Sequence, residues 1–261
     1  QCYVHIGTGN YHKDTAKLYT DLGLFTTKPA FAEDVVELFH FLTGRSLKRN
    51  YQKLLVAPVG MKERFLEMIK RETELAKAGR SGRIVAKCNS LEDVMVCRAL
   101  YEASQAGVKI DLIVRGFCCL RPKVPGLSEN IRVISVIGRF LEHSRIFYFQ
   151  NGATDPLDGL FFMGSADWMY RNLLGRIEAV VPIEDRSGRE RIWEILEVMM
   201  ADRRCCWELN ADGSYTQLKP QNPDDKGTHE KLMQLTRARH HLAREKQVVE
   251  GALIPRVRGP G

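Results

Sequence analysis

The chain has 261 residues, of which 44% are hydrophobic and 27% are charged, the proportions of an ordinary globular protein rather than of a disordered one. No apolar run approaches the roughly 18 residues of a membrane span, and no basic and then apolar leader opens the sequence, so we expect a cytoplasmic protein. The net charge of +7 favours a polyanionic partner, without separating nucleic acid, nucleotide, anionic lipid and inorganic phosphate chains.

The first elements are predicted to be two strands and a helix. Alternating residues favour a strand over residues 2–7, and a second strand follows at residues 22–27. Residues 32–42 form an amphipathic helix, because their apolar side chains recur at helical spacing. The segment between the strands contains a glycine-rich turn, Gly7-Thr8-Gly9-Asn10.

From residue 52, strands and helices alternate. Strands are predicted at residues 54–58, 84–87 and 108–114, and helices at residues 62–78 and 91–106. Ser90 is the expected N-cap of the second helix and Gly107 its stop. This alternation predicts a parallel or mixed sheet covered by helices.

The next block is rich in strands, and the tail is polar. Strands are predicted at residues 131–137, 145–149, 160–163 and 177–181, followed by a helix at 187–200. The order of turn, strand and helix after Gly164-Ser165-Ala166-Asp167 repeats the order after Gly7-Thr8-Gly9-Asn10, which indicates a duplicated unit. A turn at 210–214 between short strands, a linker at 220–225 and a polar helix at 228–246 complete the chain, and we expect disorder from residue 251.

His143 and Arg145 are the strongest candidates for chemistry. They are two positions apart at the start of a strand, so both side chains point to one face. A histidine beside a guanidinium suits phosphate chemistry, because the base and the positive charge meet on one anion. In the later turn, Gly164 and Ser165 can offer amides and a hydroxyl to phosphate oxygens, and Asp167 can orient a histidine.

Four more residues are weaker candidates. Glu178 is a carboxylate in an apolar strand, for which a histidine partner is expected. Arg115 and Arg121 lie in a loop after a strand and form a candidate phosphate clamp, with a solvated loop as the alternative. Tyr19 can stack on a base or donate to a phosphate, and core packing fits its pattern equally well.

Several motifs together resemble the carboxyl-terminal half of the polyphosphate kinases of bacteria. The resemblance extends from Gln1 to about Trp207 and rests on blocks in the right order, which are Tyr3-Val4-His5-Ile6-Gly7-Thr8-Gly9-Asn10-Tyr11, Thr15-Ala16-Lys17-Leu18-Tyr19-Thr20-Asp21, Ile113-Val114-Arg115-Gly116, Phe140-Leu141-Glu142-His143-Ser144-Arg145 and Gly164-Ser165-Ala166-Asp167-Trp168-Met169. It implies two phospholipase D-like catalytic domains that meet at one site.

The resemblance also implies a mechanism. In that family a histidine takes the terminal phosphate of ATP as a phosphohistidine and passes it to inorganic polyphosphate, with Mg²⁺ assisting. The second histidine of the site corresponds to His143, and nucleotide contacts correspond to Tyr19, Arg115 and His143. The strand that carries the phosphorylated histidine precedes Gln1, and the family's Mg²⁺-linked residues also lie upstream, so no metal ligand is expected here. Neither His5 nor His12 stands in the required His-x-Lys/Arg strand pattern.

These observations give one interpretation and two alternatives. We expect an α/β protein with phospholipase D-like mixed sheets flanked by helices: the end of a first catalytic domain (1–46), a second related domain (47–219) and a basic tail (220–261). The expected catalytic residues are His143, Arg145 and Glu178, and the phosphate-binding residues also include Gly164 and Ser165. The partners are ATP or ADP and polyphosphate, with a homo-oligomer in the full-length enzyme, no specific nucleic acid, and peripheral membrane association left open.

The alternatives are a phospholipase D-like nuclease or lipid hydrolase and a non-catalytic module that binds polyanions or nucleotides. The first is weakened because Arg145 replaces the usual lysine and Gln150 the frequent aspartate. Seven cysteines in an odd set without Cys-x-x-Cys spacing predict reduced thiols rather than a zinc site or disulfides. The segment alone is expected to bind nucleotide or polyphosphate at most.

Overall fold

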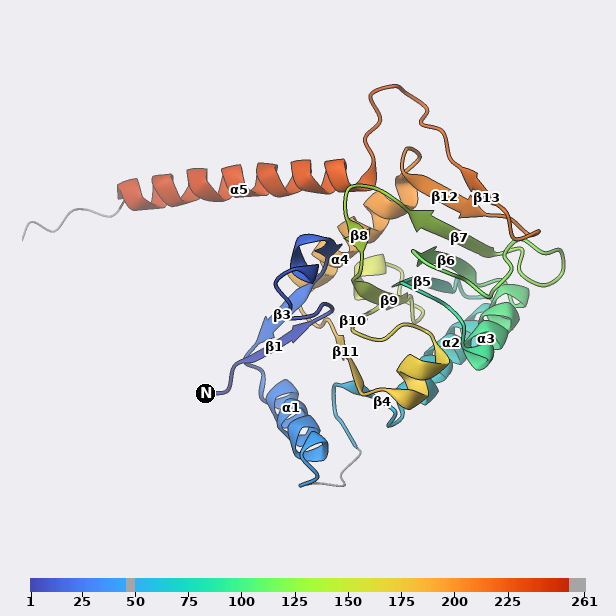
Figure 1. Ribbon diagram of the computed structural model, residues 1–261, viewed down its shortest axis with the longest axis horizontal. Coiled ribbons are helices and arrows are strands. Elements are labelled where there is room, and N and C mark those ends of the chain that lie inside the picture. Colours follow the sequence, from blue (N-terminus) through green and yellow to red (C-terminus); the bar gives the residue numbers. More distant parts are fainter. Residues whose placement is uncertain (46–49, 254–261) are drawn as a thin grey trace, which may run out of the picture.

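A nine-stranded mixed sheet forms the middle of the structure (Figure 1). The computed structural model describes residues 1–45 and 50–253, and the side chains of its last helix up to residue 244. Strands β5, β6 and β7 run parallel to one another, and all the remaining neighbouring strands in the sheet are paired antiparallel. From one edge to the other the strands are β13 (Tyr215–Gln217), β12 (Cys206–Leu209), β7 (Ile131–Val136), β6 (Lys109–Val114), β5 (Arg83–Cys88), β9 (Arg145–Phe149), β10 (Leu160–Gly164), β11 (Glu178–Pro182) and β4 (Leu55–Ala57).

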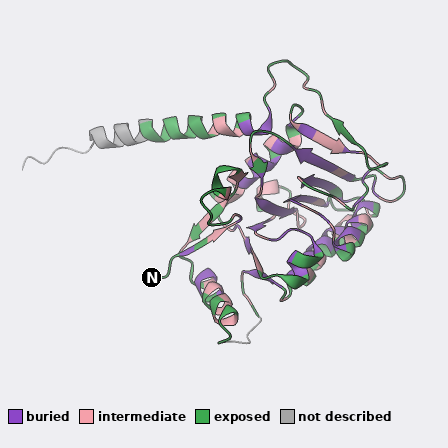
Figure 2. Cartoon of the chain, viewed as in Figure 1, coloured by how far each residue is buried: buried purple, intermediate pink, exposed green. Residues whose placement is uncertain are grey.

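Helices cover both faces of this sheet. On one face, α2 (Met61–Lys77) and α3 (Val94–Gln105) bury apolar side chains such as Phe65 and Leu100 in a core shared with the sheet. On the other face, α4 (Arg186–Ala201) buries Trp193 and Leu196 in a second core. Strands β5, β6, β7, β9 and β10 are mostly buried, whereas the edge strand β13 is exposed (Figure 2). The predicted α/β class, with a mixed sheet flanked by helices, is therefore confirmed.

A smaller part of the fold precedes the large sheet. Strands β1 (Val4–Gly7) and β3 (Gly23–Thr26) form an antiparallel pair, and α1 (Pro29–Leu42) follows. Asp34 of α1 is buried and accepts hydrogen bonds from the backbone amides of residues 52, 53 and 54, which joins α1 to the entrance of β4. The predicted boundary between residues 46 and 47 lies outside the described residues.

Two strands of two residues join this smaller part to the rest. Strand β2 (Tyr19–Thr20), which follows the short helix η1 (Thr15–Lys17), pairs in parallel with β8 (Leu141–Glu142). Neither strand is predicted by the sequence pattern, because two residues are too few for a periodic pattern. The other short helices are η2 (Pro156–Asp158) and the π-helical turn η3 (Arg171–Gly175).

The predicted start of α3 was wrong by three residues. Asp93, not Ser90, is the N-cap, and its side chain accepts from the amides of Met95 and Val96. Residues before it are held extended, because the amides of Glu92 and Asp93 both donate to the Trp168 carbonyl. Tertiary hydrogen bonds therefore delay the helix beyond the first residue that could cap it.

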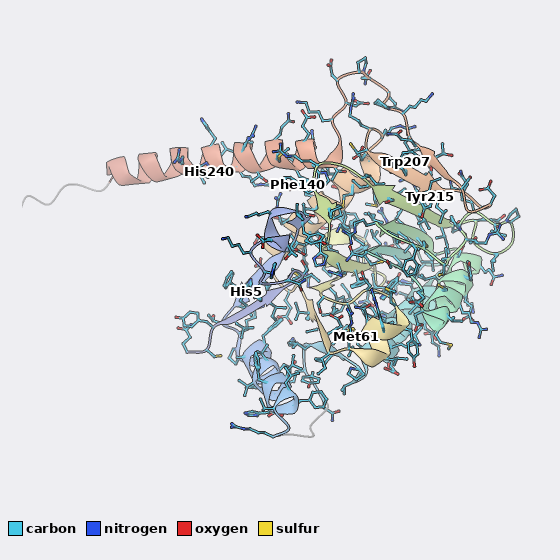
Figure 3. All side chains as sticks on the ribbon, viewed as in Figure 1. His5, Met61, Phe140, Trp207, Tyr215 and His240 are labelled. Atoms are coloured by element: carbon cyan, nitrogen blue, oxygen red, sulfur yellow. The ribbon has the colours of Figure 1, made fainter. Side chains whose placement is uncertain are left out.

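The last helix was also predicted too short. Helix α5 (Thr228–Leu253) continues past residue 246, so the expected disorder is wrong for residues 251–253, while residues 254–261 lie outside the described residues. Its first residue is anchored by Asp202, which accepts from both the amide and the hydroxyl of Thr228 at 2.7 Å. The later turns, which include His240, extend away from the sheet (Figure 3). No helix in the described residues is long and apolar enough to cross a membrane.

Candidate functional site

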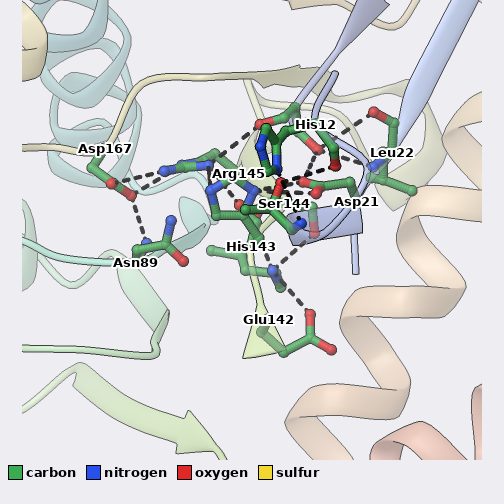
Figure 4. A network of polar contacts seen from close by, with 12 residues as sticks. His12, Asp21, Leu22, Asn89, Glu142, His143, Ser144, Arg145 and Asp167 are labelled. Carbon is green, nitrogen blue, oxygen red and sulfur yellow. Dashed lines mark hydrogen bonds and ion pairs between the residues drawn. The ribbon is translucent and has the colours of Figure 1, made fainter. Parts of the chain in front are cut away.

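His143 lies at the joint between β8 and β9, where the small N-terminal part meets the large sheet. The parallel pairing of β2 with β8 places its backbone amide 3.2 Å from the Thr20 carbonyl. The residue after Thr20 is Asp21, so this pairing brings a carboxylate to the histidine across 122 positions of sequence. Figure 4 shows the network that results.

Both ring nitrogens of His143 have a partner. Nδ1 lies 2.9 Å from Asp21 Oδ1, and Nε2 lies 3.0 Å from an NH1 nitrogen of Arg145. A guanidinium only donates, so Nε2 must accept, and the proton of the neutral ring must be on Nδ1, where it is donated to Asp21. The site thus fixes the ring orientation and one tautomer, with the lone pair on Nε2.

Arg145 is itself held by a buried carboxylate. Its Nε and NH2 atoms donate to the two oxygens of Asp167 at 3.2 and 3.1 Å, and both side chains are less than 10% exposed. Asp167 also accepts a hydrogen bond from the backbone amide of Asn89 at 2.6 Å. The prediction that Asp167 orients a histidine directly was therefore wrong: it orients the arginine that contacts the histidine.

Arg145 was predicted to bring its positive charge to a phosphate beside His143, but its guanidinium already has protein partners. Its NH1 atom donates to His143 Nε2, to the His143 carbonyl at 2.8 Å and to the Thr8 carbonyl at 3.3 Å. Most of the guanidinium hydrogens are therefore engaged with protein groups. Direct contact with a phosphate requires one of the NH1 bonds to be exchanged.

Tyr19 and Arg115 lie next to His143. The Tyr19 and His143 rings lie 4.7 Å apart between centroids, and the Arg115 guanidinium carbon lies 5.7 Å from the centre of the Tyr19 ring. In the described part of the chain, no hydrogen bond engages the Arg115 guanidinium, so its donors are available to an anion. The three residues predicted to contact nucleotide therefore lie together.

Arg115 also lines a pocket of about 530 Å³ next to the site. Arg121 lies on the same pocket, and its Nε donates to the Ala211 carbonyl at 2.9 Å. The walls are mainly apolar and aromatic, with Phe117 and Trp207 among them. The loop thus brings both arginines to one cavity, with Arg121 partly engaged by the backbone.

Gly164 and Ser165 have structural positions that the sequence analysis did not predict. Gly164 is the last residue of β10, where an added Cβ would lie 2.3 Å from the Ala179 carbonyl oxygen. The amide of Ser165 donates to that carbonyl at 3.0 Å, and its hydroxyl donates to Glu178. The expectation that the Ser165 amide and hydroxyl are free to bind phosphate was wrong, because both are used within the sheet.

Glu178 is bound by Ser165 and by Asn172, whose side-chain amide donates to it at 2.6 Å. The expected histidine partner is not found among the described residues. The sequence pattern located a carboxylate that needs partners, but spacing alone could not identify them.

The two halves of the predicted duplication share a hydrogen-bond pattern. Thr8 donates its amide to the Leu22 carbonyl at 2.9 Å, accepts from the Leu22 amide at 2.9 Å, and donates its hydroxyl to Asp21 at 2.8 Å. Ser165 makes the same three bonds, to the carbonyl and amide of Ala179 and to Glu178. Asp21 and Glu178 therefore occupy equivalent places in two similar turns.

Asp21 is the functional residue that the sequence analysis missed. It lies in the motif Thr15-Ala16-Lys17-Leu18-Tyr19-Thr20-Asp21, whose local pattern indicates no role for it. Aligning Thr8 with Ser165 places Asp21 opposite Glu178, because each carboxylate follows its hydroxyl residue by 13 positions. That internal correspondence was the available signal.

Comparisons with known proteins identify the family of the chain. A family model described as polyphosphate kinase C-terminal domain 2 matches residues 54–229, and one described as polyphosphate kinase C-terminal domain 1 matches residues 1–48. The chain belongs to the polyphosphate kinase family. It is a C-terminal portion of such a kinase, as its motifs had indicated.

Individual relatives show how much of a polyphosphate kinase is present. The chain is 60% identical over 222 residues to the polyphosphate kinase of Synechocystis sp., covering 85% of this chain and 30% of that protein. It is 56% identical over 235 residues to the enzyme of Thermosynechococcus vestitus, covering 90% of this chain and 32% of that protein. The chain thus spans about a third of the length of these relatives.

A crystal structure shows the same architecture. The polyphosphate kinase of Porphyromonas gingivalis superposes with a TM-score of 0.85 at 37% identity, covering 92% of this chain and 36% of that one. The fold described above is therefore the fold of the C-terminal part of a polyphosphate kinase.

Proposed function

We propose that this chain forms the C-terminal part of the catalytic site of an enzyme that transfers the terminal phosphate of ATP reversibly to inorganic polyphosphate. The observation that supports this function best is His143, held in one tautomer between Asp21 and Arg145 and next to the aromatic ring of Tyr19. An oriented imidazole is suited to proton transfer on a phosphate, and Arg115, whose guanidinium makes no hydrogen bond within the described residues, lies nearby.

Each residue has a distinct part in this proposal. Arg115 binds phosphate oxygens as charge builds on them, because its guanidinium has no hydrogen bond within the described residues. When a phosphate oxygen replaces Nε2 as acceptor for Arg145, His143 Nε2 takes the proton of that phosphate group or returns it to the same group. Asp21 stabilises the imidazolium formed at that moment, and Asp167 keeps Arg145 in place.

Glu178 has a proposed role in the other half of the site. Asp21 contacts His143 from the first of the two similar turns, and Glu178 has the equivalent place in the second turn. A phosphohistidine intermediate, as the family resemblance implies, requires a second histidine outside this chain. We assign Glu178 to orient that histidine as Asp21 orients His143.

Mg²⁺ is a further expectation from the resemblance. Among the described residues, no group of three or more His, Cys, Asp or Glu side chains is arranged to hold a metal ion. We therefore derive no step through Mg²⁺ on the residues of this chain. Assembly into a homo-oligomer and cytoplasmic location remain predictions, and peripheral contact with a membrane remains open.

The test uses a chimera in which this chain replaces the corresponding third of the Synechocystis polyphosphate kinase, to which it is 60% identical. His143→Asn keeps the size of the side chain but removes the titratable nitrogen. We expect ATP-dependent polyphosphate synthesis to fall by about 100-fold or more, within the range for loss of an acid or base. The matched control, His40→Asn on α1, should retain activity, and full activity of His143→Asn would refute the proposal.

A further inference from the structure

A buried lysine lies beside the two residues that flank His143. Lys87 of β5 is 2% exposed, and its Nζ donates to the Ser144 carbonyl at 2.6 Å and to the Ser144 hydroxyl at 2.9 Å. Its third contact is Glu142, with Nζ and Oε2 3.1 Å apart. An ammonium has three donors, so each one has an acceptor on the segment that carries His143.

Glu142 is held from its other side by α5. Its Oε1 lies 2.7 Å from His229 Nε2, and both side chains are less than 10% exposed. Burial alone would raise the pKa of Glu142, but Lys87 and His229 outweigh it and lower this pKa to about 2. The carboxylate is therefore ionised, and it links β5 to the start of α5.

The contacts between Lys87 and Glu142 lie away from solvent. The space bounded by Lys87, Val136, Arg115 and Glu142 is too small to admit a water molecule. A lysine charge in such a place gains all its stabilisation from fixed protein acceptors, and an apolar residue of similar volume would often be at least as stable. The charge is thus poorly explained by stability alone and well explained by control of geometry.

We propose that Lys87 is a positioning residue for His143. It fixes Glu142 and Ser144 on either side of the histidine, and so keeps the ring between Asp21 and Arg145. His229 completes the arrangement by holding Glu142 from α5. The consequence for catalysis rests on the proposed function, whereas the consequence for the ring does not.

The histidine ring can be observed directly in this chain by ¹⁵N NMR with labelled imidazole nitrogens. The His143 signals are assigned by their loss in His143→Asn. We expect the wild-type ring to be almost entirely in the form protonated on Nδ1, and Lys87→Met to give a mixture of both tautomers. The control is Lys62→Met, because Lys62 is also largely buried and pairs with Asp93 at 2.7 Å away from the histidine. This control should leave the His143 tautomer unchanged.

If Lys87→Met does not fold, as circular dichroism would show, Ser144→Ala takes its place. This variant removes one of the three acceptors and leaves the backbone carbonyl, and we expect a smaller change of tautomer in the same direction. A folded variant of either kind with an unchanged His143 tautomer would overturn the proposal.

A second measurement separates positioning from binding. In the chimera, Lys87→Met should lower kcat by about 10- to 100-fold, the range for a misplaced catalytic group, and change the KM for ATP by less than about threefold. Lys62→Met should change neither constant appreciably. If no version of the chimera is active, the kinase function fails, while the NMR result still decides the role of Lys87.

Discussion

Arg145 and Asp167 form a buried ion pair with two parallel contacts, Nε to Oδ1 at 3.2 Å and NH2 to Oδ2 at 3.1 Å. The two residues are 22 positions apart, at the start of β9 and just after β10, and the antiparallel pairing of these strands brings them together. Two parallel contacts fix the plane of the guanidinium, not only its place. NH1, the remaining guanidinium nitrogen, then points toward His143 Nε2.

Asp167→Asn should destabilise the chain and loosen the site. The substitution preserves shape but leaves the Arg145 charge buried without a counter-charge, which costs about 3 kcal/mol or more. We expect this loss in the free energy of unfolding measured with urea. His143 should also lose its fixed tautomer, which the ¹⁵N signals of its ring would report.

The control for this variant is an exposed carboxylate with the same kind of partner. Asp155 pairs with Arg186 at 3.0 Å, and both side chains are more than 40% exposed. Asp155→Asn should lower the free energy of unfolding far less than Asp167→Asn, because exposed pairs contribute little. Equal losses for the two variants would show that the buried pair has no special importance.

Gly164→Ala should disrupt the sheet beneath the site. A Cβ at this position would lie 2.3 Å from the Ala179 oxygen and 2.6 Å from the Val180 Cα, both backbone atoms that cannot move aside independently. We expect a loss of about 1–3 kcal/mol, the usual cost of overpacking, as a lower midpoint of thermal unfolding. Gly175→Ala is the control, since nothing lies within 4 Å of its added Cβ. A stable Gly164→Ala would mean that β10 and β11 can separate easily.

Much of the fold was predictable because its strands and helices have strong local patterns. Strand β9 was predicted with its observed bounds, and α2 and α4 within one residue at each end. The start of α3 was not, because the Trp168 carbonyl holds Glu92 and Asp93 extended from a distant part of the chain. Local capping preference cannot reveal such a contact.

The candidate site was predictable in its members but less so in their roles. His143, Tyr19 and Arg115 lie together, as the family resemblance implied. The sequence suggested Asp167 as the carboxylate that orients the histidine, but Asp21 contacts the His143 ring, because the pairing of β2 with β8 brings it there. Asp167 binds Arg145 instead. A two-residue strand pair leaves no periodic trace, so the local pattern of neither segment reveals the contact between Asp21 and His143.

Tyr19 should contribute to nucleotide binding through its ring rather than through its hydroxyl. Tyr19→Phe preserves the contact with His143, so we expect the affinity of the chimera for a fluorescent ATP analogue to change by less than about twofold. Tyr19→Ala removes an aromatic contact worth about 1 kcal/mol, which corresponds to roughly fivefold weaker binding. Tyr3→Ala, at an exposed tyrosine, is the control. Weaker binding in Tyr19→Phe would instead indicate a hydroxyl contact with phosphate.

The reactivity of the cysteine thiols should depend on their burial. All seven cysteines are free in the structure. Burial raises the pKa of Cys97 and of Cys206 to about 12, so these thiols are protonated at neutral pH and react slowly. Cys2 and Cys119 are exposed. We expect a disulfide reagent at pH 8 to modify these two rapidly, and mass spectrometry should locate them. Rapid modification of Cys97 or Cys206 would contradict the described packing.

Glu142 should make the stability of the chain depend on acid pH. Its pKa in the folded state is lowered from 4.5 to about 2, by the attraction of Lys87 and His229 acting against burial. A carboxyl group of this kind stabilises the fold above pH 4.5 and loses that contribution as the pH falls toward 2, since the unfolded chain takes up its proton first. The full contribution is about 3 kcal/mol.

Glu142→Gln isolates this contribution. The difference in the free energy of unfolding between wild type and variant, measured with urea, should be largest at pH 6–7 and should shrink between pH 4.5 and 2. Glu67→Gln, which affects an exposed pair with Arg64, should show no such trend. A difference that is the same at pH 3 and pH 7 would mean that Glu142 is not ionised beside Lys87, and the link from β5 through Glu142 to α5 would then lose its electrostatic basis.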